Sequence, residues 1–91
     1  MHEKAIIRFR IAESGHETDL EIPLNITAAE LITALNMAFH LGISEDRLAE
    51  AYLKTENPAA LLKGNRLLSE SGIYNGTIII HEGKAGYEPA L

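Results

Sequence analysis

Apolar and polar residues alternate along two neighbouring stretches near the start of the chain. Residues 4–12 and 17–24 place an apolar side chain at nearly every second position, with charged residues between them. A period of two is typical of a strand that buries one face. The residues between the two stretches, Glu-Ser-Gly-His at 13–16, are typical of a turn. The pattern therefore predicts an N-terminal hairpin, in which acidic residues of the second strand face Arg8 and Arg10 of the first.

The pattern changes to a helical period in residues 26–42, ITAAELITALNMAFHLG. Thr27 followed by Glu30 is the signature of a capping box, which predicts that the helix begins here. Gly42 is expected to end the helix in a left-handed conformation. The predicted helix spans Thr27–Leu41. One apolar stripe along it is expected to face the core: Leu31, Ala34, Leu35, Ala38, Phe39 and Leu41.

Shorter segments follow the helix. Residues 51–56 and 60–63 are predicted strands, and residues 77–82, TIIIHE, have the β-branched composition of a central strand. Because the apolar stripe of the single helix must be covered by the sheet, the sequence predicts a two-layer α+β domain. We expect the first and last strands to lie side by side in a mixed sheet. We expect this domain to occupy residues 1–82 and residues 83–91 to form a flexible tail.

The composition narrows the classes of function. Thirteen acidic and eight basic residues give a net charge of −5, which argues against unspecific binding of nucleic acid. The sequence has no cysteine, so disulfides and thiolate chemistry are excluded, and this fits a cytoplasmic protein. No apolar run approaches the ~20 residues of a membrane span, so we expect no direct membrane insertion.

No group of residues predicts a catalytic, metal or cofactor site. The four histidines lie far apart and lack the spacing of a metal-binding pair: His2, His16, His40 and His81. Asp19 and Glu21 share one strand face, where a solvated acidic surface is the simpler interpretation. Ser69 and Ser71 have no nearby base and are expected to form a turn. We therefore expect no enzyme activity and no cofactor.

The order of the segments resembles the ubiquitin-like proteins over residues 4–82. The resemblance rests on the ββα order, on the helix start Thr27-Ala28-Ala29-Glu30, and on the run from Leu67 to Ile80, LLSESGIYNGTIII. In ubiquitin-like proteins this late segment has leucine, small polar residues, Gly-Ile, an Asn/Asp-Gly turn and then the central strand. The resemblance implies a ubiquitin-like β-grasp fold.

Within that superfamily the chain is similar to the YukD/EsaB-type proteins, through its short length, acidic balance and missing Gly-Gly. Those are small cytoplasmic proteins associated with type VII (WXG-type) secretion in Gram-positive bacteria. The resemblance implies a non-catalytic protein-interaction module, accessory or regulatory in such a system. Its expected partner is a secretion-system component or regulator.

The resemblance also implies an interaction surface. If Ile79 faces the helix, Ile78 and Ile80 point to the open face of the sheet, which ubiquitin-like proteins use to bind partners through an apolar patch ringed by basic residues. The predicted patch, here called the sheet patch, consists of Ile6, Arg8, Arg10, Ile78 and Ile80. It would bind a partner protein or a second copy of the chain. A register shifted by one residue would instead bury Ile78 and Ile80 and expose Ile79.

A conjugated modifier or sulfur carrier is the alternative function. Both need a C-terminal Gly-Gly whose carboxylate is adenylated, because only glycine lets the backbone enter a narrow activating site. The sequence ends Glu-Pro-Ala-Leu at 88–91, and Gly83 and Gly86 are single glycines. This function would therefore require proteolytic processing.

Overall fold

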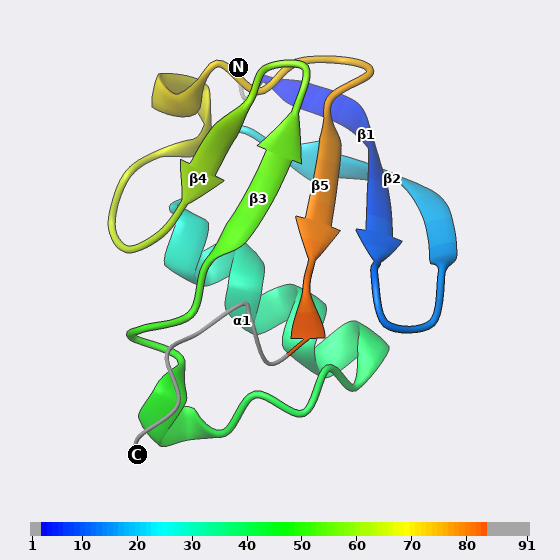
Figure 1. Cartoon of the computed structure of the whole chain (residues 1–91). Coiled ribbons are helices and arrows are strands. Elements are labelled where there is room, and N and C mark those ends of the chain that lie inside the picture. The colour runs from blue at the N-terminus through cyan, green and yellow to red at the C-terminus, as the bar shows by residue number, and fades with distance from the viewer. Residues whose placement is uncertain (1–2, 84–91) are drawn as a thin grey trace.

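The computed structural model describes residues 3–83, in which one helix packs across a single five-stranded sheet (Figure 1). The α+β prediction is confirmed. Two short 3-10 helices lie in the connections after α1 and after β4. The elements in chain order are β1 (Lys4–Ile11), β2 (His16–Pro23), α1 (Ala28–Phe39), η1 (Glu45–Arg47), β3 (Leu53–Glu56), β4 (Ala60–Leu62), η2 (Leu68–Ser71) and β5 (Ile78–His81). Most of the predicted tail, residues 84–91, lies outside the described residues.

The strands are ordered β2-β1-β5-β3-β4 across the sheet. β1 and β5 are parallel neighbours, as predicted for the first and last strands, and the other pairs are antiparallel. Phe9 is the Cα partner of Ile79, so these two residues point to the same face of the sheet. Both are fully buried. The face they share is therefore the one covered by α1, and we call the opposite face the open face.

The start of α1 follows the sequence pattern. The amide of Glu30 donates to Thr27 Oγ1 over 3.1 Å, and the Thr27 amide donates to Glu30 Oε1 over 2.9 Å. The predicted capping box is thus present. The next free amides of the helix start, those of Ala28 and Ala29, donate to the carbonyls of Arg66 and Gly64, each over 2.9 Å. The helix start is therefore tied to the loop before η2.

The end of α1 differs from the prediction. The helix ends at Phe39, two residues before Leu41, and His40 itself adopts the left-handed conformation with φ 53°. Gly42 is also left-handed, with φ 81°, but it lies in the following loop. The cause is the side chain of Asn36, which hydrogen-bonds both backbone groups of Ile43 and turns the chain back toward the helix. Ile43 is buried there.

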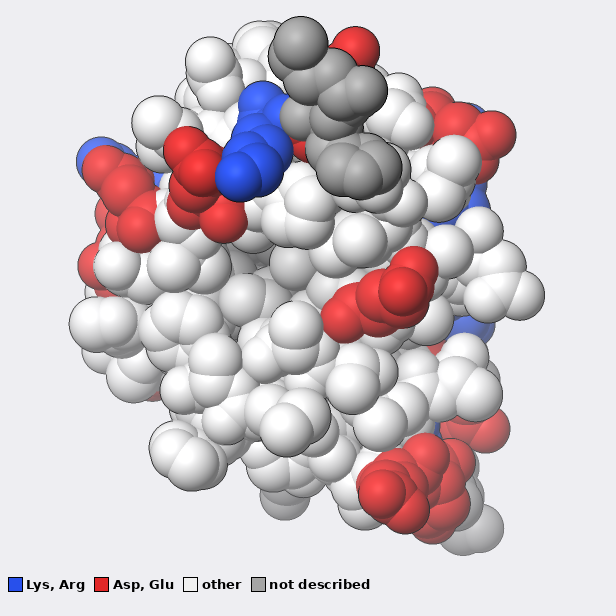
Figure 2. Space-filling model, turned by 180° about the vertical axis from the view of Figure 1, so that it is seen from behind, with Lys and Arg blue, Asp and Glu red and all other residues white. Residues whose placement is uncertain are grey.

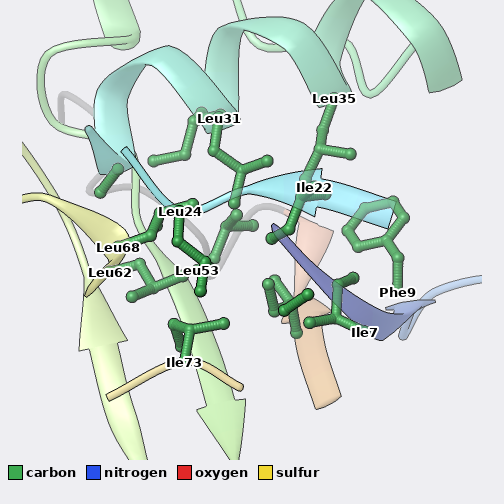
Figure 3. Packing of buried hydrophobic residues seen from close by; sticks show 14 of the residues in the cluster. Ile7, Phe9, Ile22, Leu24, Leu31, Leu35, Leu53, Leu62, Leu68 and Ile73 are labelled. Carbon is green, nitrogen blue, oxygen red and sulfur yellow. The ribbon is translucent and has the colours of Figure 1, made fainter. Parts of the chain in front are cut away.

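The core lies between α1 and the sheet (Figure 3). The helix contributes four buried residues to it: Ala28, Leu31, Ile32 and Leu35. The predicted stripe was partly wrong, because Ala34 and Ala38 are exposed. Successive helical residues turn by about 100° around the axis, so an arc centred on Leu31, Ile32 and Leu35 leaves both alanines outside the contact with the sheet.

Candidate functional site

The sheet patch lies on the open face, over β1 and β5. Its isoleucines alternate with core residues: Ile79 is fully buried under α1, while Ile6 is 54% exposed and Ile78 is half-buried. Arg8 is the Cα partner of Ile78, and Arg10 is the partner of Ile80. The structure thus brings all five predicted patch residues to one face, in the register that places Ile79 inward.

Ile80 differs from the other isoleucines of the sheet patch. Only 9% of its surface is exposed. In the sheet it lies between Arg10 on β1 and Lys54 on β3. Long basic side chains commonly lay their methylene groups over neighbouring apolar surface. The apolar surface that a partner can reach therefore centres on Ile6 and Ile78, and not on three equally exposed isoleucines.

A shallow hollow adjoins Ile6 and Ile78. Its lining also includes Arg8, Asp19 and the turn Asn75–Gly76. The turn is fixed to β1 by two hydrogen bonds at Ile6: the Ile6 amide donates to Asn75 Oδ1 over 2.8 Å, and the Gly76 amide donates to the Ile6 carbonyl over 3.0 Å. Gly76 has φ 95°, which favours glycine. Because these two hydrogen bonds hold its rim, the hollow is present in the chain without a partner.

The basic border of the sheet patch is already ion-paired. Arg8 Nε lies 3.2 Å from Asp19 Oδ1, and Arg10 Nε lies 2.7 Å from Glu17 Oε2. These pairs confirm the predicted contact between the two hairpin strands. Exposed pairs of this kind contribute little to stability, about 0–1 kcal/mol each. They do mean that a partner meets a border carrying both signs of charge, and not a free basic ring.

The border on the β3 side also carries both signs. Glu56 is the Cα partner of Ile78, and Lys54 is the partner of Ile80. Lys54 Nζ lies 3.0 Å from Glu82 Oε1. The hydrogen bond that the Lys54 ammonium group donates to the Glu82 carboxylate raises the pKa of Lys54 above its ordinary value. Lys54 therefore keeps its charge beside the patch.

Sequence reasoning missed two exposed side chains near this surface. Leu61 on β4 is 52% exposed and pairs with Lys54, so it lies on the open face at the far edge of the sheet. Tyr74 is 49% exposed and precedes Asn75 in the turn beside the hollow; its hydroxyl donates to Asn57 Oδ1 over 2.8 Å. The alternation of β4 could have indicated Leu61, but the three-residue strand is too short to fix its inward face.

The two carboxylates considered for catalysis are each ion-paired on the hairpin. Asp19 pairs with Arg8, and Glu21 lies 3.7 Å from Lys4. No group of three or more His, Cys, Asp or Glu side chains within residues 3–83 could hold a metal ion. His81 is buried, and burial lowers its pKa below the ordinary value. The negative charge of Glu13 acts in the opposite direction, but its effect is smaller. None of the helices described is long and apolar enough to cross a membrane.

The fold is shared with solved ubiquitin-like domains. The C-terminal ubiquitin-like domain of mouse tubulin-specific chaperone e superposes with a TM-score of 0.71 and 10% identity, covering 99% of this chain and 93% of that domain. The ubiquitin-like domain of tubulin-binding cofactor B gives 0.67 and 14%, covering 98% and 100%. The UBL domain of Plasmodium falciparum Dsk2 gives 0.56 and 19%, covering 86% and 97%. At these identities the likeness establishes the ubiquitin-like fold alone.

Sequence comparison identifies the family. No curated protein matches the chain. A family model does match, over residues 6–80, and it describes protein YukD of the WXG100 protein secretion system (Wss). The matched region includes most of both central strands, the whole helix and the hollow beside Ile6. The chain is thus a ubiquitin-like member of the YukD family of the WXG100 secretion system.

Proposed function

We propose that this protein is a non-catalytic adaptor of the WXG100 secretion system, acting in the cytoplasm, and that it binds a protein component or regulator of that system through the sheet patch. Membership of the YukD family supports a role in the WXG100 secretion system, and the ubiquitin-like fold supports a role in protein–protein contact.

The observation that carries the proposal is the exposure of Ile6 beside a preformed hollow. Ile6 is 54% exposed, although the solvated face of a sheet normally carries polar residues. Ile78 extends the same apolar surface, and the Asn75–Gly76 turn fixes its edge. An apolar centre with a charged margin has the anatomy of a protein interface.

The proposal is tested by binding to the cytoplasmic components of a WXG100 secretion system. The purified chain serves as bait, and the retained components are quantified by mass spectrometry. Ile6→Glu should reduce retention of the specific component on the order of tenfold or more, because it places a charge at the centre of the contact. The variant should remain folded, since Ile6 lies outside the core.

Met37→Glu is the matched control. Met37 is also an exposed apolar residue, at 73%, but it lies on α1 and points away from the sheet. It should leave binding of that component unchanged. Equal retention by the wild type and Ile6→Glu would refute the sheet patch as the docking surface, and loss of binding in Met37→Glu alone would assign it to the helix.

A further inference from the structure

The two edges of the sheet differ in length and in charge. β4 forms one edge with three residues, whereas β2 forms the other with eight. Within residues 3–83, β2 has β1 as its single neighbour (Figure 1). Its register with β1 runs without a break from Pro23 to His16, so no bulge interrupts the edge. Of the devices that blunt open edges in natural sheets, β4 has shortness and β2 has charged side chains.

The backbone groups of β2 point alternately toward β1 and toward the open edge. Just beyond β2, the Leu24 amide donates to the Glu3 carbonyl over 2.9 Å, so the bonds between the two strands fall on the even-numbered residues of β2. The amides and carbonyls of Glu17, Asp19 and Glu21 therefore point away from β1. These groups form a row to which another strand can pair.

The side chains of the same three residues line the edge on the open face. We call them the acidic row: Glu17, Asp19 and Glu21. Each pairs with a basic side chain of β1 on its inner side. The three acidic side chains nevertheless remain 35%, 63% and 59% exposed in chain order, and a carboxylate can accept several hydrogen bonds. The outer side of the edge thus presents charge of one sign.

The side of the edge toward α1 is apolar. Leu20 on β2 is half-buried and packs against the core. Phe39 at the end of α1 is also half-buried, and its ring lies 5.0 Å from that of Phe9, the Cα partner of Thr18. Figure 2 shows this side of the molecule, where charged side chains lie mainly around the margin of a wide uncharged area. An added strand would therefore meet carboxylates on one face and apolar groups on the other.

From these two sides of one edge we propose that β2 binds an extended segment of a partner protein in which basic and apolar residues alternate. The segment pairs antiparallel to β2, which is the more stable pairing per residue, and extends the sheet. Its basic side chains lie opposite the acidic row, where cross-strand pairs of opposite charge are favourable. A second copy of the chain is a poor occupant, because pairing two β2 edges would oppose one acidic row to the other.

This edge site is separate from the sheet patch. The sheet patch lies over β1 and β5 on the open face, whereas the added strand lies beyond β2 and bonds to its backbone. The inference therefore does not rest on the proposed function, and each surface can be tested without the other.

A synthetic peptide tests the pairing. It has eight residues, the length of β2, with arginine and valine alternating and both ends blocked. Fluorescence anisotropy follows its binding to the full wild-type chain. In the proposed pairing the arginine amides bond to β2 and the valine amides point outward, so N-methylation of the arginine amides should weaken binding on the order of tenfold or more. The peptide with N-methylated valine amides is the matched control and should bind as the unmodified one does. Equal binding of the two methylated peptides would overturn the proposal, because attraction between charges alone does not distinguish them.

Amide hydrogen exchange locates the peptide on the chain. With the unmodified peptide bound, the amides of Glu17, Asp19 and Glu21 should exchange more slowly, because they gain hydrogen bonds. The amides of Thr18 and Leu20, which already bond to β1, should change little. Unchanged exchange at the acidic row would contradict pairing at this edge. Slower exchange there on raising the concentration of the chain alone would assign the edge to a second copy and overturn the choice of partner.

Two double variants test the role of charge. Asp19→Asn with Glu21→Gln should weaken binding of the unmodified peptide on the order of tenfold, because two cross-strand charge pairs are lost. The variant should stay folded, since exposed ion pairs contribute little to stability. Glu45→Gln with Asp46→Asn removes the same charge from η1 and should bind close to the wild type. Equal losses in the two variants would show that net charge attracts the peptide, and would refute the β2 edge as its site.

Discussion

The side chain of Asn36 makes two hydrogen bonds to the backbone of Ile43. Its Nδ2 donates to the Ile43 carbonyl over 2.8 Å, and its Oδ1 accepts from the Ile43 amide over 3.0 Å. This pair replaces the two bonds that a neighbouring strand would supply. It holds the loop after α1 against the helix and buries the Ile43 side chain in the core.

Asn36→Ala should therefore destabilise the domain. Removing the amide leaves both backbone groups of Ile43 without their partner, at a cost of about 1–3 kcal/mol in the free energy of unfolding. Chemical denaturation measures this cost. Asn36→Asp is the control, because it keeps the acceptor for the Ile43 amide and should lose less. A stability equal to that of the wild type in Asn36→Ala would show that the loop is held by Ile43 packing alone.

Thr27→Ala should weaken the start of α1. It removes the acceptor of the Glu30 amide and one donor to the Glu30 carboxylate, so we expect a loss of about 0.5–2 kcal/mol. Thr27→Ser keeps the hydroxyl and should stay close to the wild type. Thermal unfolding compares the three proteins, and equal melting temperatures for the alanine and serine variants would argue against the capping box.

Leu35→Ala should be the most damaging of these changes. Leu35 is 4% exposed and packs in the cluster between α1 and the sheet (Figure 3). Truncation of a buried leucine costs about 2–5 kcal/mol. Met37→Ala, two residues along the same helix, should cost almost nothing in dilute solution because Met37 is exposed. A similar loss in both variants would contradict the assignment of the two helix faces.

His81 should make stability depend on pH. Burial lowers its pKa in the folded chain, so the unfolded chain binds the proton more readily as the pH falls through the ordinary value of about 6.5. The contribution is fully present above that value and is lost as the pH falls toward the folded pKa. Melting temperatures measured between about pH 7.5 and 5 should fall more steeply for the wild type than for His81→Leu. Parallel profiles would exclude His81 as the cause.

The sequence predicts best those features whose causes lie within a few residues. The capping box is contained in Thr27–Glu30, and its prediction is confirmed. Gly42 is a local signal that predicts a helix end at Leu41, whereas the deciding contact joins Asn36 to Ile43 across a loop. The spacing of Ala34 and Ala38 fits an apolar stripe and predicts that they are buried, but the position of the sheet decides which arc of the helix is covered.

The sheet patch likewise has one feature that neighbouring residues determine and another that distant contacts determine. Alternation along β1 and β5 places the patch residues on one face of the sheet. The sequence predicts this placement as soon as Ile79 is assigned to the face that packs on the helix. The exposure of each residue depends on its neighbours across the sheet. Ile80 is 9% exposed at its position between Arg10 and Lys54, and the rim of the hollow beside Ile6 includes Asn75, 69 residues away in the sequence. Those contacts exist only in the folded sheet.

The most direct test of the proposed docking surface is an NMR titration of the isotope-labelled chain with the secretion-system component that it retains. Backbone amide shifts are followed as the unlabelled component is added in steps. We predict that the largest changes cluster at Ile6, Arg8 and Ile78 and at the Asn75–Gly76 turn, and that they disappear with Ile6→Glu. Changes confined to Thr33, Ala34 and Met37, with the amides of β1 and β5 unmoved, would contradict the account.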